Sequence, residues 1–425
     1  MSTLIELELT NEVPVFLGSY DTEFHTWDAF RTQSLKGLWR WWFRAYVMGI
    51  LYENNLLKTR PGRRTLVELD KTCIDNITKL VGNLLGNTDQ ASRFRISISI
   101  NRVGRERSCP GYDPYCMTHR IKLLTLGGRK ITYTDLLSVK LMIEERLSFK
   151  KLSNDELLLG IGSLLTALIL NGIGKMGRRG IGTFNIRLIR DHTGLFRKYF
   201  RRDGSLDLDR APELIREVRK ACNEYVSKFL TLKHSVSSLN IPPYDLISEH
   251  KVNVENVTFD FDQFEKPEFL KDSTIPVFMI YEVKWSGKRM NDVATELVDF
   301  FYRPGRIRRY FGGPNTPYGS WHDFLTIKKH CWFFGLPREQ RGTGYIVRDE
   351  VNRRASPIHL SIHKDRAYFT VFLSLDWPQS IDWIGAGSAQ IIIDESRIIK
   401  AYVESLTYLQ SYLKKLNYSF KVIFP

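Results

Sequence analysis

Two stretches of the sequence combine positive charge with features suited to an anionic polymer. The first, GIGKMGRRGIGTFNI (172–186), has three cations and no acidic residue. Its glycines permit positive backbone φ and let backbone N–H groups approach a ligand closely. Lysine and arginine beside such a backbone suit phosphate groups. We therefore predict that this glycine-rich loop binds a phosphate backbone through Gly172, Gly174, Lys175, Gly177, Arg178, Arg179, Gly180 and Gly182.

The loop does not match the familiar nucleotide-binding glycine motifs. It lacks the G-x-x-x-x-G-K-[ST] spacing of a P-loop. A dinucleotide fingerprint follows a strand and opens a helix, whereas this loop follows a predicted helix (155–170) and precedes a predicted strand (183–190). A loop that only turns the chain would not need three cations, so phosphate binding is the favoured interpretation.

The second stretch is a predicted helix over 34–53, SLKGLWRWWFRAYVMGILYE. Its apolar residues fall on one face at helical spacing: Leu35, Leu38, Trp39, Trp42, Phe43, Tyr46 and Ile50. Lys36, Arg40 and Arg44 form a stripe on the other side, and Trp41 projects near Arg44. A tryptophan on the solvent side of the helix, beside three cations, is suited to stacking and phosphate binding with single-stranded RNA. The alternative is a solvated basic face with Trp41 covered by an insertion.

The composition supports an anionic partner. The chain has 425 residues, with 62 Lys+Arg against 47 Asp+Glu, for a net charge of +15. A basic surface implies nucleic acid, an acidic protein or a membrane face. The uncharged stretch 157–174 has a helical part of about 15 residues, short of the ~20 that span a bilayer, so we expect a buried core helix and no membrane partner.

The five cysteines, an odd number without regular spacing, argue against a disulfide framework and favour a reducing cytoplasm. Cys109, Cys116 and His119 are the one cluster to consider for zinc. They lack a C-x2-C pair, so a loop with incidental cysteines is the favoured interpretation, and we expect no metal and no cofactor.

Hydrophobic periodicity predicts an α+β protein in which one order of elements occurs twice. The order strand, helix, strand, strand, helix, strand is the ferredoxin-like (RRM-like, βαββαβ) motif. We predict domains over 1–190 and 274–425, a helical and irregular connecting region over 191–273, and insertions near 54–92 and 303–355. The first copy comprises 2–9, 34–53, 93–100, 119–126, 155–170 and 183–190, and the second 274–283, 292–302, 356–363, 367–375, 395–416 and 418–424.

The runs RTQSLKGLWRWWFRA (31–45) and NGIGKMGRRGIGTF (171–184) resemble the helix and glycine-rich-loop signatures of the RAMP superfamily of CRISPR proteins. The resemblance is closest to the two-domain first subunit of the Cmr (type III-B) effector complex. FFGLPR (333–338) and RRASPIHL (353–360) also look like the second domain of that subunit, so the resemblance covers most of the chain except 191–273.

The resemblance implies a non-catalytic RNA-binding subunit of a cytoplasmic ribonucleoprotein in antiviral defence. Its partners would be the guide RNA near its 3′ end, target single-stranded RNA and other Cmr subunits. The second copy departs from the pattern, because only LKKLNYS joins its last helix and strand. RNA contacts there would come from basic segments such as 303–314, with Arg306, Arg308 and Arg309, or 336–344; either could equally dock a neighbouring subunit.

Two alternatives remain open. One is a RAMP endoribonuclease, with His25 as a general base beside Asp21 and Asp28, in a loop that is otherwise read as polar turn residues. The other is an assembly subunit whose basic loops dock acidic partners. His359 and His363 share one face of a predicted strand without a third ligand, and we interpret them as structural.

Overall fold

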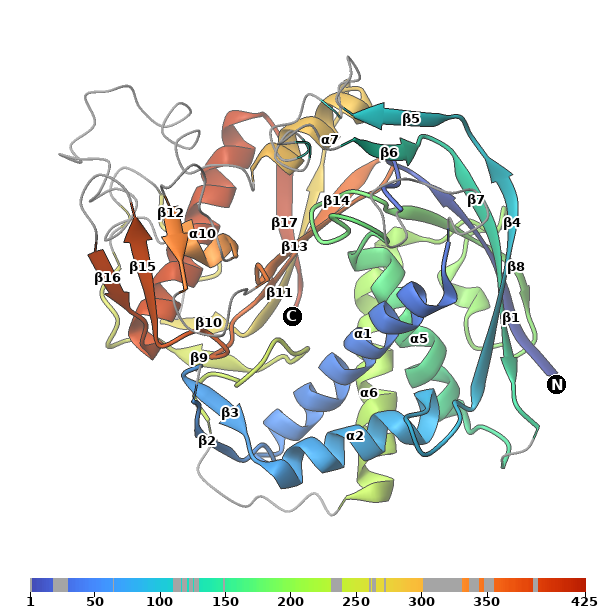
Figure 1. The fold of residues 1–425 in the computed structure, drawn as a ribbon, viewed down its shortest axis with the longest axis horizontal. Helices are drawn as coiled ribbons and strands as arrows, with labels where there is room; N and C mark the ends of the chain where they lie inside the picture. Colours follow the sequence, from blue (N-terminus) through green and yellow to red (C-terminus); the bar gives the residue numbers. More distant parts are fainter. Residues whose placement is uncertain are drawn as a thin grey trace.

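The computed structural model describes residues 2–17, 30–63, 65–109, 116, 121, 125, 130–147, 150–230, 239–259, 261, 265–270, 273–300, 331–335, 344–347, 355–384 and 389–425. Within these ranges the chain is a mixed α/β protein built on antiparallel sheets (Figure 1). The predicted insertion near 54–92 contains strands β2 (Thr59–Pro61) and β3 (Val67–Leu69) and helix α2 (Lys71–Leu85).

The first four-stranded sheet has the order β4-β7-β1-β8, with every neighbouring pair antiparallel. Its strands are β1 (Ser2–Asn11), β4 (Phe94–Val103), β7 (Leu137–Glu145) and β8 (Phe184–Asp191). Successive side chains of a strand point to opposite faces, so Ile5, Leu7 and Leu9 of β1 are all buried. Between them, Glu6 pairs with Lys140 at 2.6 Å. One face therefore joins the core and the other carries ion pairs.

The third strand of this sheet corrects the sequence interpretation. We expected it at 119–126, but β7 occupies that place in the sheet, between β4 and β1. Residues 119–126 lie mostly outside the described ranges. The signal for β7 was present in the sequence, because Leu137, Val139, Leu141 and Ile143 alternate strictly and are all buried.

Three helices pack together on the inner side of the first sheet (Figure 1): α1 (Thr32–Glu53), α5 (Asn154–Leu170) and α6 (Ala211–Phe229). Helix α5 begins with the predicted capping box, in which the Ser153 and Glu156 side chains each bond the other's backbone N–H. Nearly all of α5 is buried. Among the described residues, no helix is both long enough and apolar enough to cross a membrane.

The second four-stranded sheet has the order β13-β14-β11-β17, again antiparallel throughout. Its strands are β11 (Phe278–Lys284), β13 (Ile358–Ile362), β14 (Arg366–Phe372) and β17 (Ser419–Phe424). Helices α7 (Met290–Asp299) and α10 (Glu395–Lys415) follow the predicted positions of the two helices in the second copy.

Both faces of the second sheet are covered. On one side Phe369 of β14 contacts Phe300, which in turn contacts Tyr412 of α10. On the other side Phe372 contacts Trp41 of α1. This double covering explains why β11, β13 and β14 are continuously apolar or buried instead of alternating.

The remaining strands form small accessory sheets. Strands β5 (Glu106–Cys109) and β6 (Ile131–Thr134) pair with each other, as do β9 (Lys251–Asn253) and β10 (Thr274–Pro276). A three-stranded sheet has the order β12-β15-β16, from Gly344–Ile346, Ser380–Ile384 and Ala389–Ile392. Short 3-10 helices cover Arg197–Tyr199, Leu208–Arg210 and Cys331–Phe334.

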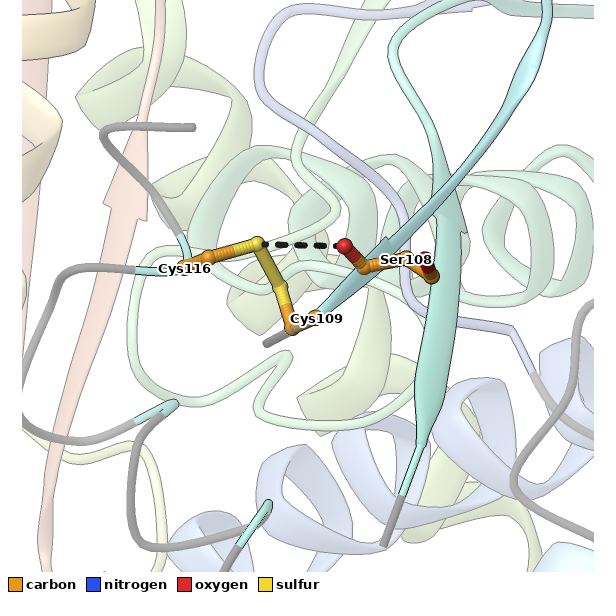
Figure 2. Close-up of a disulfide and its surroundings, with 3 residues drawn as sticks. All are labelled: Ser108, Cys109 and Cys116. Atoms are coloured by element: carbon orange, nitrogen blue, oxygen red, sulfur yellow. Dashed lines mark hydrogen bonds between the residues drawn. A yellow bond between two sulfur atoms is a disulfide. The ribbon is translucent and has the colours of Figure 1, made fainter. Parts of the chain in front are cut away.

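A disulfide joins Cys109 at the end of β5 to Cys116, and both side chains are buried (Figure 2). The expectation of reduced cysteines is therefore wrong for this pair. Bonded sulfurs cannot serve as thiolate ligands, so the zinc alternative built on these residues is also wrong. Its third member, His119, lies outside the described residues.

Candidate nucleic-acid interface

A cavity of about 710 Å³ lies between the N-terminal half of α1 and the glycine-rich loop. We call it the loop groove; Gly37 and Trp41 line it from α1, and Lys175, Arg178 and Arg179 line it from the loop. None of its described lining residues carries a carboxylate. The first turn of α1 has no acidic residue and no side-chain cap, so the positive end of the helix dipole adds to the field of the three cations.

Seven backbone N–H groups of the loop donate hydrogen bonds to backbone oxygens of the protein. The N–H groups of Gly172 and Lys175 donate to the carbonyl oxygens of Gly177 (2.8 Å) and Phe16 (2.9 Å). The N–H groups of Ile173, Gly177, Arg179, Gly180 and Gly182 also donate to backbone oxygens. The expectation that loop N–H groups approach a ligand is therefore wrong for these residues, and any ligand contact by Lys175 or Arg179 comes from the side chain.

Close packing explains the glycines instead. A Cβ on Gly172 would lie 1.9 Å from the carbonyl oxygen of Ile181. Gly182 has φ of +71°, and its Cβ would lie 2.1 Å from the carbonyl oxygen of Ile173. The two ends of the loop therefore touch backbone to backbone, which only glycine permits.

The loop also joins the two sheets. Gly180 N–H donates to Leu360 O (2.8 Å), and Leu360 N–H donates to Arg178 O (3.0 Å). These bonds form a short parallel bridge to β13, the edge strand of the second sheet. The second sheet thus helps to fix the conformation of the cationic loop.

Trp41 is half-buried, which corrects the expectation that it projects into solvent. Its ring contacts His359 and Phe372 of the second sheet, and the Arg178 guanidinium lies 5.0 Å from the ring centroid. Among the described residues, the second sheet and the loop cover Trp41. Its cation–π contact holds Arg178 at the loop groove.

The three cations of α1 do not share one site. Lys36 and Arg40 line a separate cavity of about 160 Å³ beside the end of α2. Arg40 Nη2 donates to the carbonyl oxygens of Leu85 (2.7 Å) and Gly86 (2.8 Å), so this side chain caps α2. Arg44 lines a third cavity, together with Trp41. Of the four α1 candidates, only Trp41 therefore joins the loop residues at the loop groove.

Residues 28–185 match the family model of the RAMP superfamily. This part of the chain is similar to RAMP-superfamily proteins. This match includes both α1 and the glycine-rich loop, so the two runs that suggested the family lie inside the matched region. The resemblance expected from the sequence is confirmed.

Solved structures share the fold over nearly the whole chain. Cmr1 from Pyrococcus furiosus in its apo form is 15% identical, with 99% of each chain covered and a TM-score of 0.50. A second similar structure is a chain of a type III-B Cmr-beta structure bound to cognate target RNA and AMPPnP. The two chains are 12% identical, the match covers 96% of this chain and 100% of the other, and the TM-score is 0.51. No curated protein sequence matches significantly.

Several sequence candidates fall outside the described residues: Arg306, Arg308 and Arg309 of the second insertion, and Asp21, His25 and Asp28 ahead of α1. The two histidines of the predicted strand over 356–363 are structural, as predicted. His359 is buried against Trp41 and Phe372. His363 Nε2–H donates to Ile169 O at 2.8 Å, and burial lowers its pKa to about 4.

Proposed function

We propose that this chain is a non-catalytic, RNA-binding RAMP subunit of a type III-B CRISPR effector complex in the cytoplasm. Its partners would be guide RNA, target single-stranded RNA and other subunits of the complex. The observation that carries the proposal is the loop groove, in which three cations and a helix N-terminus converge without a described carboxylate. The shared fold with a chain of an RNA-bound Cmr-beta structure supports it.

We further propose that the chain comprises two tandem ferredoxin-like domains, over 1–190 and 274–425. The strand orders β4-β7-β1-β8 and β13-β14-β11-β17 support this, since each places the same sequential strands at the centre and edges. Helix α6 of the connecting region packs against α1 and α5, which favours a close association with the first domain.

The groove favours contacts to phosphates over recognition of base sequence. Lysine and arginine side chains supply its charge, and one approach to the Trp41 ring is already taken by Arg178. Phosphate contacts fix position but carry no sequence information. Binding should therefore depend weakly on sequence and strongly on salt.

The testing experiment measures single-stranded RNA binding by the purified chain at two salt concentrations, with the same samples examined on a gel for cleavage. Tight, salt-sensitive binding of intact RNA is expected. Cleaved RNA without added metal would favour an endoribonuclease. Undetectable binding would favour an assembly subunit whose basic loops dock acidic partners.

A further inference from the structure

The cavity beside α2 differs from the loop groove in position, size and lining. It lies between α1, the end of α2 and the end of β7, and its volume is about 160 Å³. Ligand and cofactor sites typically occupy roughly 300–1,000 Å³, so this cavity suits one small group. Its polar described lining residues are Lys36, Arg40, Asn87, Gln90, Ser92 and Arg146, and no described carboxylate lines it.

The three cations that line this cavity differ in their contacts within the protein. Arg40 is held by the two carbonyl oxygens that end α2. Arg146 Nε is buried and has no hydrogen-bond partner among the described residues. Neither Lys36 nor Arg146 forms an ion pair with another described residue. A buried guanidinium nitrogen without a partner is costly, and an anion in the cavity would relieve that cost.

We propose that this cavity is a second anion site, which binds a single phosphate group through Lys36 and Arg146, with Arg40 held in place behind them. The side-chain amides of Asn87 and Gln90 line the cavity and supply further N–H donors. The phosphate group belongs either to a bound RNA strand or to free inorganic phosphate. The proposal rests on the lining of this cavity and does not require the loop groove to bind RNA.

The test titrates inorganic phosphate into the full chain by calorimetry at fixed ionic strength, with chloride as the reference anion. Saturable, phosphate-specific binding is expected, weakened at least tenfold in Lys36→Met and in Arg146→Met. Lys79→Met and Arg102→Met remove the same charges from exposed positions outside the cavity and should bind phosphate like the parent chain. Thermal unfolding without phosphate checks that each variant folds.

A second arm separates the two sources of phosphate. If RNA supplies the group, Arg146→Met lowers the slope of log affinity against log salt by about 1. If free phosphate is the ligand, Arg146→Met loses phosphate binding while the RNA slope stays unchanged. The proposal is overturned if the parent chain shows no phosphate-specific binding and the RNA slope is the same in all four variants. The proposed phosphate site does not depend on RNA binding at the loop groove, because the phosphate titration uses no RNA.

Discussion

At the scale of single residues, tertiary contacts give similar side chains different roles. Arg40 and Arg178 both looked like phosphate ligands, yet Arg40 caps a helix and Arg178 lies over Trp41 at the loop groove. The sequence predicted the cationic character of these positions, because residue type and helical spacing suffice for that. It could not assign their partners, since α2, β13 and β14 reach them from distant parts of the chain.

Arg178→Ala should weaken RNA binding about tenfold at low salt, because one charge-assisted phosphate contact is lost. The slope of log affinity against log salt should fall by about 1. Fluorescence anisotropy with a labelled single strand measures both. Arg102→Ala, which removes an exposed cation of β4 that does not line the loop groove, is the matched control. Equal affinity in the two variants would contradict a role for Arg178.

Stability should depend on pH through His363. Its pKa is about 4 in the folded chain and near 6.5 when exposed, so the unfolded state binds a proton that the folded state does not. Above about pH 6.5 the imidazole is neutral in both states, so it adds no pH dependence. As the pH falls from 6.5 to 4, the free energy of unfolding decreases by about 3 kcal/mol. Chemical denaturation of the parent chain and of His363→Gln across this range gives the difference. Identical pH profiles would contradict the assignment.

At the scale of elements, the long periodic segments were predictable and the short insertions were not. The capping box of α5 and the alternation of β1, β4 and β8 are local signals, and each element lies where it was expected. The error at β7 came from placing the third strand at 119–126 without considering the alternating run that begins at Leu137. The disulfide between Cys109 and Cys116 had no spacing signal, because it depends on how the chain returns after β5.

Two glycines that line the loop groove should respond oppositely to alanine. A Cβ on Gly172 would overlap the Ile181 carbonyl oxygen, so Gly172→Ala should destabilise the fold by about 2 kcal/mol or more. A Cβ on Gly37 meets nothing within 4 Å, so Gly37→Ala in α1 should stabilise it by about 1 kcal/mol. Urea denaturation measures both. Equal stabilities would contradict the packing described for the loop.

At the scale of the whole molecule, the two sheets share one interior. The glycine-rich loop bonds to β13, and Arg366 of β14 contacts Glu282 of β11 and Asp209 of the connecting region, at 2.6 and 2.5 Å. The order of elements in each half was predictable from periodicity. The way the second sheet packs onto α1 was not, because apolar strands buried on both faces do not reveal which element covers them.

Arg366→Met should destabilise the chain by about 3–5 kcal/mol, because Glu282 is then left buried with a weaker set of partners. The double variant Arg366→Met/Glu282→Gln should recover part of this loss. Arg289→Ala removes an exposed ion pair with Asp292 and should change stability by less than about 1 kcal/mol. Denaturant unfolding measures the stability of each variant. If Arg366→Met lost no more stability than Arg289→Ala, the stabilising role of the Arg366 contacts would be contradicted.

The most direct test of the central claim changes the loop groove at Gly37 and measures affinity for single-stranded RNA. Gly37→Glu and Gly37→Gln place side chains of nearly equal size in the groove, but only Glu adds a negative charge. If the groove holds RNA phosphates, Gly37→Glu binds RNA at least tenfold more weakly than Gly37→Gln at low salt, and the difference shrinks as salt rises. Equal RNA affinities of the two variants, with both folded, would contradict RNA binding in this groove.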